Sequence, residues 1–231
     1  DDKDKMALYL ADMRAQHIRV LPPDVNASQN EFTAVGEDVR FGLGAIRNVG
    51  ESVVAGIVGA RTEHGPAEDF YEFLDQVPLS VCNKRCIESL IKAGAFDSMC
   101  RSRRALMEVF EGAVDGVIDL KRNQANGQDD LFGDLLGGDE DADTALSRTV
   151  PEVPDWDKRT KLAFEREMLG LYVSDHPLHG LEHVLGAESS VGIGALVESG
   201  ADLDGHVETI CGMITQVQRR QSKSGAFWGT V

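Results

Sequence analysis

The sequence lacks an apolar run of the length that a membrane-spanning helix requires, and it has few cysteines. A transmembrane helix needs about 18 or more apolar residues in succession, and no such run is present, so we expect no membrane contact. No apolar signal core follows the charged start Asp1–Lys5, which predicts a cytoplasmic location and reduced thiols. This start has no initiator Met, so we expect a longer parent chain.

The sequence also lacks a complete set of metal ligands. Cys82 and Cys86 are one helical turn apart, but no second ligand pair follows at the spacing of a zinc site. His176, His179 and His183 have no carboxylate or cysteine that would complete a set. We therefore predict no metal site and no cofactor in this chain.

Bases are scarce, with 23 against 39 acids and a net charge of −16. An acidic chain is a poor candidate for nucleic-acid binding, which depends largely on neutralising phosphates. The charge is uneven, however, because residues 83–104 hold six bases and two acids, a net +4. Such a surplus favours a nucleic-acid contact, although a solvated helix face has a similar composition. We call this segment the basic island; its bases are Lys84, Arg85, Lys92, Arg101, Arg103 and Arg104.

Apolar periodicity predicts a mainly α-helical fold with a small β part. Loose alternation around Gly36 predicts a hairpin within residues 32–43, and a strand-like pattern follows Gly205, with a turn at 223–225. Two strands are not stable alone in water, so we expect the last strands to begin a larger β domain. We expect helices over residues 3–17, 53–64, 70–77, 80–93 (with Gly94 as C-cap), 99–121 and 156–170.

Residues 123–155 have a different composition. They are rich in Asp, Gly and Pro, and Arg148 is their only base. No helical period survives, which predicts a solvated acidic linker. Within it, Leu131 and Phe132 are a large apolar pair that has no core to join. With Gln128 they resemble the pentapeptide by which bacterial polymerases bind the sliding clamp.

Two segments resemble the helix-hairpin-helix motif. In that motif a tight turn with positive φ and the next helix N-terminus direct backbone N–H groups at a DNA phosphate. The first segment is 41–50, where Asn48 replaces the family's first turn glycine; an ordinary helix-initiating turn would have similar residues. The second is 90–97. The candidate DNA-binding residues are Gly44, Asn48, Val49, Gly50 and Ser52 in the first, and Lys84, Arg85, Gly94, Arg101, Arg103 and Arg104 around the second.

A more specific string lies at residues 164–178. Its pattern, E-x-E-x-L-G-x-Y-x-S-x-H-P-L, is similar to one in the alpha subunits of bacterial DNA polymerase III, with Asp175 where Gly is common. The hairpins, the pentapeptide and this string occur in the order of that family. The resemblance implies a tail of the polymerase fingers (1–40), tandem helix-hairpin-helix units (41–122), the linker with the clamp motif (123–155), a helical connector (156–186) and the start of an OB-fold (187–231).

The resemblance also implies a function for the parent protein. Such a subunit is a replicative DNA-directed DNA polymerase, whose Mg²⁺ ions are held by aspartates of a palm domain that would precede this chain. We assign no catalytic residue here, and we expect the chain alone to be inactive. The implied partners are duplex primer–template DNA, the sliding clamp, other subunits of the holoenzyme and single-stranded DNA at the OB-fold, at the bacterial nucleoid. An error-prone paralogue and a non-enzymatic DNA- and clamp-binding adaptor are the alternatives.

Overall fold

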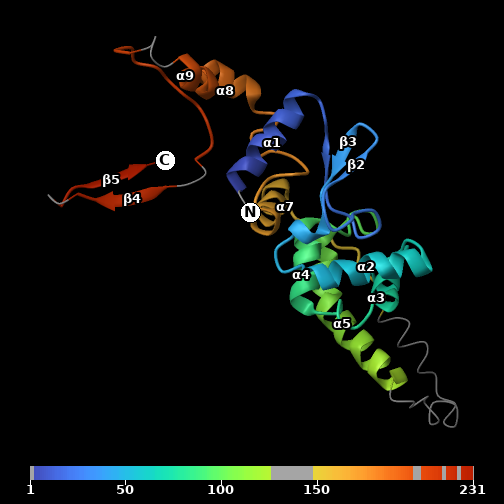
Figure 1. Cartoon of the computed structure of the whole chain (residues 1–231). Helices are drawn as coiled ribbons and strands as arrows, with labels where there is room; N and C mark the ends of the chain where they lie inside the picture. Colours follow the sequence, from blue (N-terminus) through green and yellow to red (C-terminus); the bar gives the residue numbers. More distant parts are fainter. Residues whose placement is uncertain (1–2, 126–147, 200–203, 215–216, 223–224, 231) are drawn as a thin grey trace, which may run out of the picture. The chain divides into compact units, whose positions relative to one another are not determined.

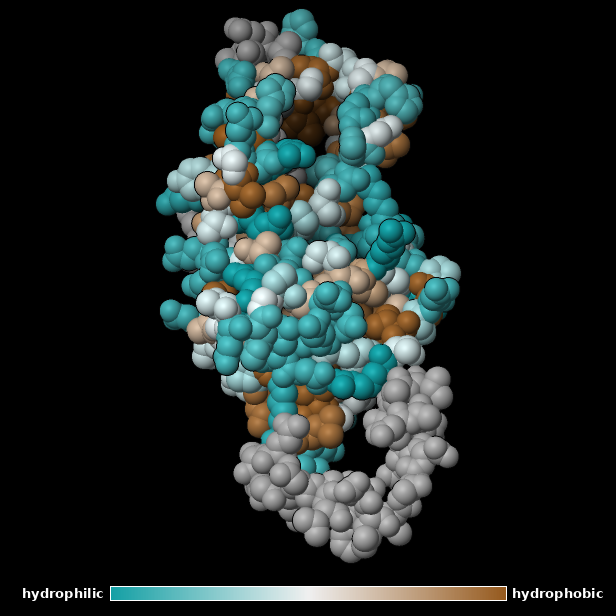
Figure 2. Space-filling view, turned by 90° about the vertical axis from the view of Figure 1, so that its right-hand side faces the viewer, coloured by the Kyte–Doolittle hydropathy of each residue, from teal (hydrophilic) through white to brown (hydrophobic). Residues whose placement is uncertain are grey.

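The computed structural model describes residues 3–125, 148–199, 204–214, 217–222 and 225–230. The chain divides into two compact units, Asp1–Asp175 and His176–Val231. No helix among the described residues is long and apolar enough to cross a membrane. In the view of Figure 2 the described surface is mostly hydrophilic, with apolar residues in smaller patches.

The first unit is mainly helical (Figure 1). A small sheet has the strand order β1-β3-β2, in which β1 runs parallel and β2 antiparallel to β3. Gly36, with φ of +63°, lies in the turn between β2 and β3, which confirms the predicted hairpin. The elements are α1 (Lys3–Ala15), β1 (Val20–Leu21), β2 (Thr33–Val35), β3 (Asp38–Arg40), the 3-10 helix η1 (Leu43–Ala45), α2 (Glu51–His64), α3 (Phe70–Gln76), α4 (Lys84–Ala93), α5 (Arg103–Ala125) and α7 (Lys158–Leu169).

Side-chain caps set the helix boundaries. Asn83 accepts from the amides of Arg85 and Cys86 and so begins α4 at Lys84, after the predicted start at residue 80. Gly94 ends the helix with φ of +82°, as predicted. Helix α7 is bounded in the same way, by the Asp157 side chain and by Gly170 in the left-handed region. Caps of these types satisfy helix-end groups that have no partner within the helix.

The core of the first unit lies between α2, α3, α4, α5 and α7. Helix α4 contacts both α5 and α7, and α3 contacts α5. Three phenylalanines meet edge to face at its centre, since the Phe96 ring lies 5.3 Å from Phe70 and 5.0 Å from Phe73. Met168 and Leu169, at the end of α7, belong to the same cluster. Residues beyond the predicted linker thus complete the core of the helices before it.

A buried ion pair fastens α7 to the turn between α4 and α5. Arg103 is 4% exposed, and its Nη2 lies 2.6 Å from Asp97 Oδ2 and 3.0 Å from Glu165 Oε1. Glu165 is completely buried, and its second oxygen accepts from the Ser174 amide at 3.1 Å. Burial alone would lower the pKa of Arg103, but the hydrogen bonds and charges of the two carboxylates outweigh it and raise that pKa.

The predicted acidic linker is corrected at both ends. Residues 123–125 are the last residues of α5. Arg148 pairs with Asp75 at 2.6 Å, Val150 packs against the core, and Asp155 accepts from the Arg104 amide at 3.2 Å. Residues 148–155 therefore contact the helices. Arg148 pairs with a carboxylate of α3, and Asp155 accepts from a backbone amide in the first turn of α5, which has no acceptor within that helix.

The described residues of the second unit form two short helices and one pair of strands. They are α8 (Glu182–Glu188), α9 (Ile193–Ser199), β4 (Gln218–Gln221) and β5 (Phe227–Thr230). The strands are antiparallel, and Gly225 donates its amide to the Ser222 carbonyl at the predicted turn. No further strand occurs among the described residues 204–214. The OB-fold start stays a prediction.

Replacing Glu165 with Ala should lower the free energy of unfolding by about 3–5 kcal/mol, because a buried guanidinium then loses its fully buried partner. The control is Arg104→Ala, which removes an exposed pair with Glu108 one turn away and should change stability by at most about 0.5 kcal/mol. Urea denaturation followed by circular dichroism measures both. Equal midpoints for the two variants would show that the buried pair does not hold α7.

Candidate nucleic-acid interface

The first hairpin turn joins η1 to α2. Asn48 has φ of +66°, which confirms the left-handed backbone predicted there, and Asn tolerates that region better than other non-glycine residues. Gly50 is the N-cap of α2, with φ of −87°. The turn therefore requires a positive φ at Asn48 and not at Gly50.

Contacts with the core and with the end of α7 fix the position of this turn. Ile46 and Val49 are buried, and the Val49 amide donates to the Ile46 carbonyl at 3.1 Å. The Arg47 amide donates to the Met168 carbonyl at the end of α7, at 2.9 Å. Val49, a predicted DNA contact, thus anchors the turn with its side chain and uses its N–H within the chain.

The start of α2 exposes amides that have no acceptor. Among the described residues, the backbone N–H groups of Gly50, Glu51 and Ser52 donate no hydrogen bond, as expected for the first residues of a helix. Gly50 is exposed, and a Cβ built on it meets nothing within 4 Å. Free N–H groups and the positive end of the helix dipole together suit an anion such as a phosphate.

Gly44 has a structural role, and its predicted contact with DNA stays a prediction. Its amide donates to the Asn30 carbonyl at 3.0 Å, and a Cβ on Gly44 would lie 2.4 Å from Asn30 Oδ1. Glycine is required here because the loop before β2 packs against η1.

Two arginines flank the turn. A pocket of about 180 Å³ is lined by Arg47, Asn48, Arg85, Glu88, Ser89, Lys92, Glu167 and Met168. Lys92 pairs with Glu88 at 2.7 Å, whereas neither Arg47 nor Arg85 forms an ion pair within the described parts of the chain. Both arginines are exposed. Arg47 was missing from the sequence-based candidates, although its position inside the turn was a signal that could have identified it.

The remaining bases of the basic island are dispersed. Lys84 pairs with Asp115 on α5 at 2.7 Å, and this hydrogen bond raises the pKa of Lys84. Arg104 pairs with Glu108. Arg101 is exposed but lines a different pocket, with residues 151–154. The island is therefore one segment of sequence and not one surface.

The prediction that Arg103 binds DNA is wrong, because its guanidinium is buried between Asp97 and Glu165. Gly94 in the second turn is buried as well, and its amide donates to Ile91. A Cβ on Gly94 would lie 2.3 Å from Arg103 Nη2. Glycine is thus needed at the second turn to admit the arginine, and the second turn is a structural hairpin.

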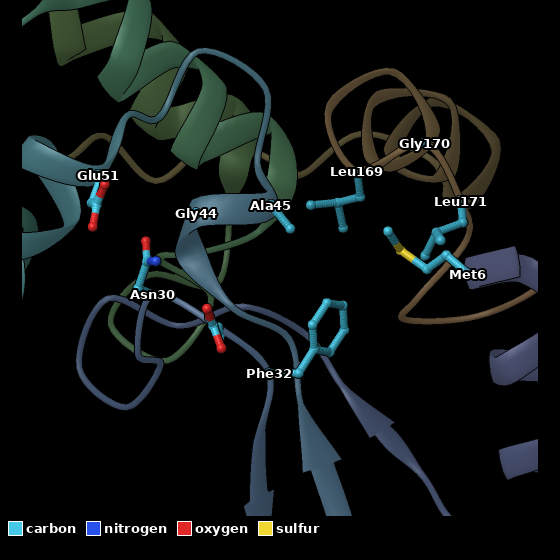
Figure 3. Close-up of a pocket in the computed structure, with 10 residues that line it drawn as sticks. Met6, Asn30, Phe32, Gly44, Ala45, Glu51, Leu169, Gly170 and Leu171 are labelled. Carbon is cyan, nitrogen blue, oxygen red and sulfur yellow. The ribbon is translucent and has the colours of Figure 1, made fainter. Parts of the chain in front are cut away.

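A larger pocket, of about 550 Å³, is lined by Gly44 and Ala45 of η1 among others (Figure 3). Met6, Phe32 and Leu169 are on one side of it, and Asn30 and Glu51 are on the other (Figure 3). The carboxylates of Glu31 and Glu51 border it. The residues that line it include no base, whereas the smaller pocket has three bases against Glu88 and Glu167. Since an excess of negative charge opposes a phosphate, the candidate anion surface lies on the Arg47 side of the turn.

The strand pair of the second unit carries a different arrangement. Arg219 lies over the Phe227 ring at 5.5 Å, and Arg220 lies over the Trp228 ring at 5.6 Å. All four residues are exposed. Flat aromatic and guanidinium groups of this kind can stack on bases.

No cluster of potential metal ligands occurs in the ranges that the structure describes. Burial raises the pKa of the Cys86 thiol to about 11, which disfavours the thiolate that binds metals. The proposed clamp residues Gln128, Leu131 and Phe132 lie outside the described residues.

A family model described as helix-hairpin-helix motif matches residues 17–106, which include both turns. The chain is 50% identical over its whole length to DNA polymerase III subunit alpha of Saccharopolyspora erythraea, and 46% identical to that of Mycobacterium tuberculosis. It is 36% identical, over 98% of its length, to the same subunit of Thermus aquaticus. The chain spans about a fifth of these relatives, 18–19% of their length. Since the similarity extends over the whole chain, the chain belongs to the DNA polymerase III alpha-subunit family.

Proposed function

We propose that this chain is the part of a bacterial replicative polymerase that binds duplex primer–template DNA, with the first hairpin turn as the contact. The observation that carries this proposal is the group of free amides at Gly50, Glu51 and Ser52, which follows a turn whose Arg47 and Asn48 line one pocket with Arg85. The whole protein would be a DNA-directed DNA polymerase of the holoenzyme, as its relatives' names suggest. These names favour a polymerase over a non-enzymatic adaptor.

Backbone recognition accounts for DNA binding by an acidic chain. An amide at a helix N-terminus binds a phosphate without adding a base to the composition. Arg47, Arg85 and Lys92 then supply local positive charge that exceeds the negative charge of Glu88 and Glu167 in the same pocket. Because phosphates are the same in every sequence, this contact should position the duplex without reading its bases.

We also propose that Gln128, Leu131 and Phe132 bind the sliding clamp. The support is the apolar pair in an acidic segment and its pentapeptide spacing. Two such anchors can fill pockets of a partner, since a few apolar residues dominate most interfaces.

Single-stranded DNA is a further proposed ligand, at β4 and β5. The exposed Arg219–Phe227 and Arg220–Trp228 pairs support it, because stacking on aromatic rings accepts every base. If the whole protein is a replicative polymerase, as proposed above, it would also belong to the holoenzyme at the nucleoid.

Replacing Gly50 with Ala should weaken binding to duplex DNA about tenfold, or about 1.4 kcal/mol. The new Cβ has open space in the free protein, so it would obstruct the phosphate and not the fold. Fluorescence anisotropy with a labelled duplex measures the affinity. Gly59→Ala is the matched control, because Gly59 is also exposed, lies on the same helix and has no neighbour within 4 Å of a Cβ. If both variants bind equally, the first turn is not the contact.

The double variant Arg47→Gln/Arg85→Gln should lower duplex affinity about tenfold at moderate salt and reduce the slope of log K against log salt by about 1–2. Arg101→Gln removes an exposed charge at another pocket and should leave affinity and slope nearly unchanged. Anisotropy titrations at several salt concentrations test this. If Arg101→Gln lowered the duplex affinity more than the double variant does, the proposed surface would be wrong.

A synthetic peptide of residues 124–138 should bind the sliding clamp of the same organism with roughly micromolar affinity. Burial of Leu131 and Phe132 supplies about 3–6 kcal/mol, from which the cost of ordering the peptide is subtracted. Calorimetry should detect no binding after Leu131→Ala/Phe132→Ala. Leu135→Ala/Leu136→Ala removes a similar apolar pair outside the pentapeptide and should preserve binding, so equal losses in the two peptides would refute the motif.

A further inference from the structure

We propose that Ser89 of α4 is a positioning residue for the DNA contact at the first turn, and that it acts by holding Asn48 in its left-handed conformation. The inference rests on the proposed function. It concerns a residue on the second helical hairpin that contacts the turn of the first.

The geometry connects the two residues directly. Asn48 Nδ2 donates to Ser89 Oγ at 3.0 Å, and the same hydroxyl donates to the Arg85 carbonyl at 2.9 Å. Ser89 is 2% exposed, so its oxygen has little access to water as an alternative partner. The hydroxyl therefore uses both its donor and its acceptor capacity, and its orientation is set by α4.

The left-handed backbone explains why Asn48 benefits from such a contact. A non-glycine residue with φ of +66° is in a region that side chains disfavour, and glycine is the residue that adopts it freely. The hydrogen bond to Ser89 opposes a return of Asn48 to the extended region. Asn48 immediately precedes Val49 and Gly50, so its conformation determines where the amides at the start of α2 point.

This contact also makes α4 a part of the binding surface. Ser89 follows Arg85 by one helical turn, and both line the pocket beside Arg47 and Asn48. A single hydrogen bond thus aligns the amides of the first hairpin with a cation from the second. Loss of the Ser89 hydroxyl should disorder this alignment without removing a charge or an exposed amide.

The test compares the wild type, Ser89→Ala, Asn48→Gly and the double variant, all in the 231-residue chain. Ser89→Ala should reduce duplex affinity about fivefold, while the salt slope stays that of the wild type because no charge is lost. In the Asn48→Gly background the same serine change should have no effect, since glycine adopts positive φ without support. The three-bond coupling between the amide and α protons of Asn48, measured by nuclear magnetic resonance, should change in Ser89→Ala.

Ser189→Ala is the matched control. Ser189 also donates its hydroxyl to a carbonyl one turn earlier, that of Leu185, at 2.6 Å, but it belongs to the second unit. It should bind duplex DNA as the wild type does. Thermal unfolding of each variant shows whether a loss of affinity follows from a loss of fold.

Equal affinities for the wild type and Ser89→Ala would overturn this inference, and so would a fivefold loss that persists in the Asn48→Gly background. A wild type and an Asn48→Gly variant that both fail to bind duplex DNA would overturn the proposed function instead. Because the coupling of Asn48 is measured without DNA, the two failures are distinguishable.

Discussion

A guanidinium in the interior of a protein must be neutralised, and the arrangement around Arg103 determines how the first unit is assembled. Asp97 is six residues before Arg103, but Glu165 is 62 residues after it. Since a buried charge without partners costs several kcal/mol, α7 must return to the turn between α4 and α5. That return also brings Met168 and Leu169 to the core and the Met168 carbonyl to the Arg47 amide.

The two hairpins use similar sequence elements for different purposes. In the second, Gly94 admits the Arg103 side chain, and the turn is filled from within the protein. In the first, Gly50 has open space around it, and the amides of the following residues have no acceptor within the described parts of the chain. The distinction depends on what occupies the space beside each glycine. A buried turn supports the fold, and an exposed one is left free to bind.

The bases near the two turns differ in a similar way, because three are paired within the protein and two lie beside the exposed turn. Lys84, Lys92 and Arg104 pair with carboxylates on their own or a neighbouring helix, and such pairs contribute little to an outside field. Arg47 and Arg85 remain beside the exposed turn. A net charge of −16 therefore coexists with a local surface suited to phosphates, because the field that a phosphate meets is set within about 10 Å by screening.

Local physical chemistry determined much of this protein from sequence alone. The helix end at Gly94, the left-handed Asn48 and the turn at Gly36 follow from short-range preferences of single residues, and the family follows from the order of its motifs. Burial and pairing involve residues far apart in sequence, so only the tertiary structure decided them. Arg101, Arg103 and Arg104 have nearly the same local sequence, yet Arg101 is exposed, Arg103 is buried and Arg104 is paired. Arg104 pairs with Glu108 of its own helix, but Arg103 is buried because Glu165 reaches α5 from beyond residues 126–147, and no local pattern encodes that contact.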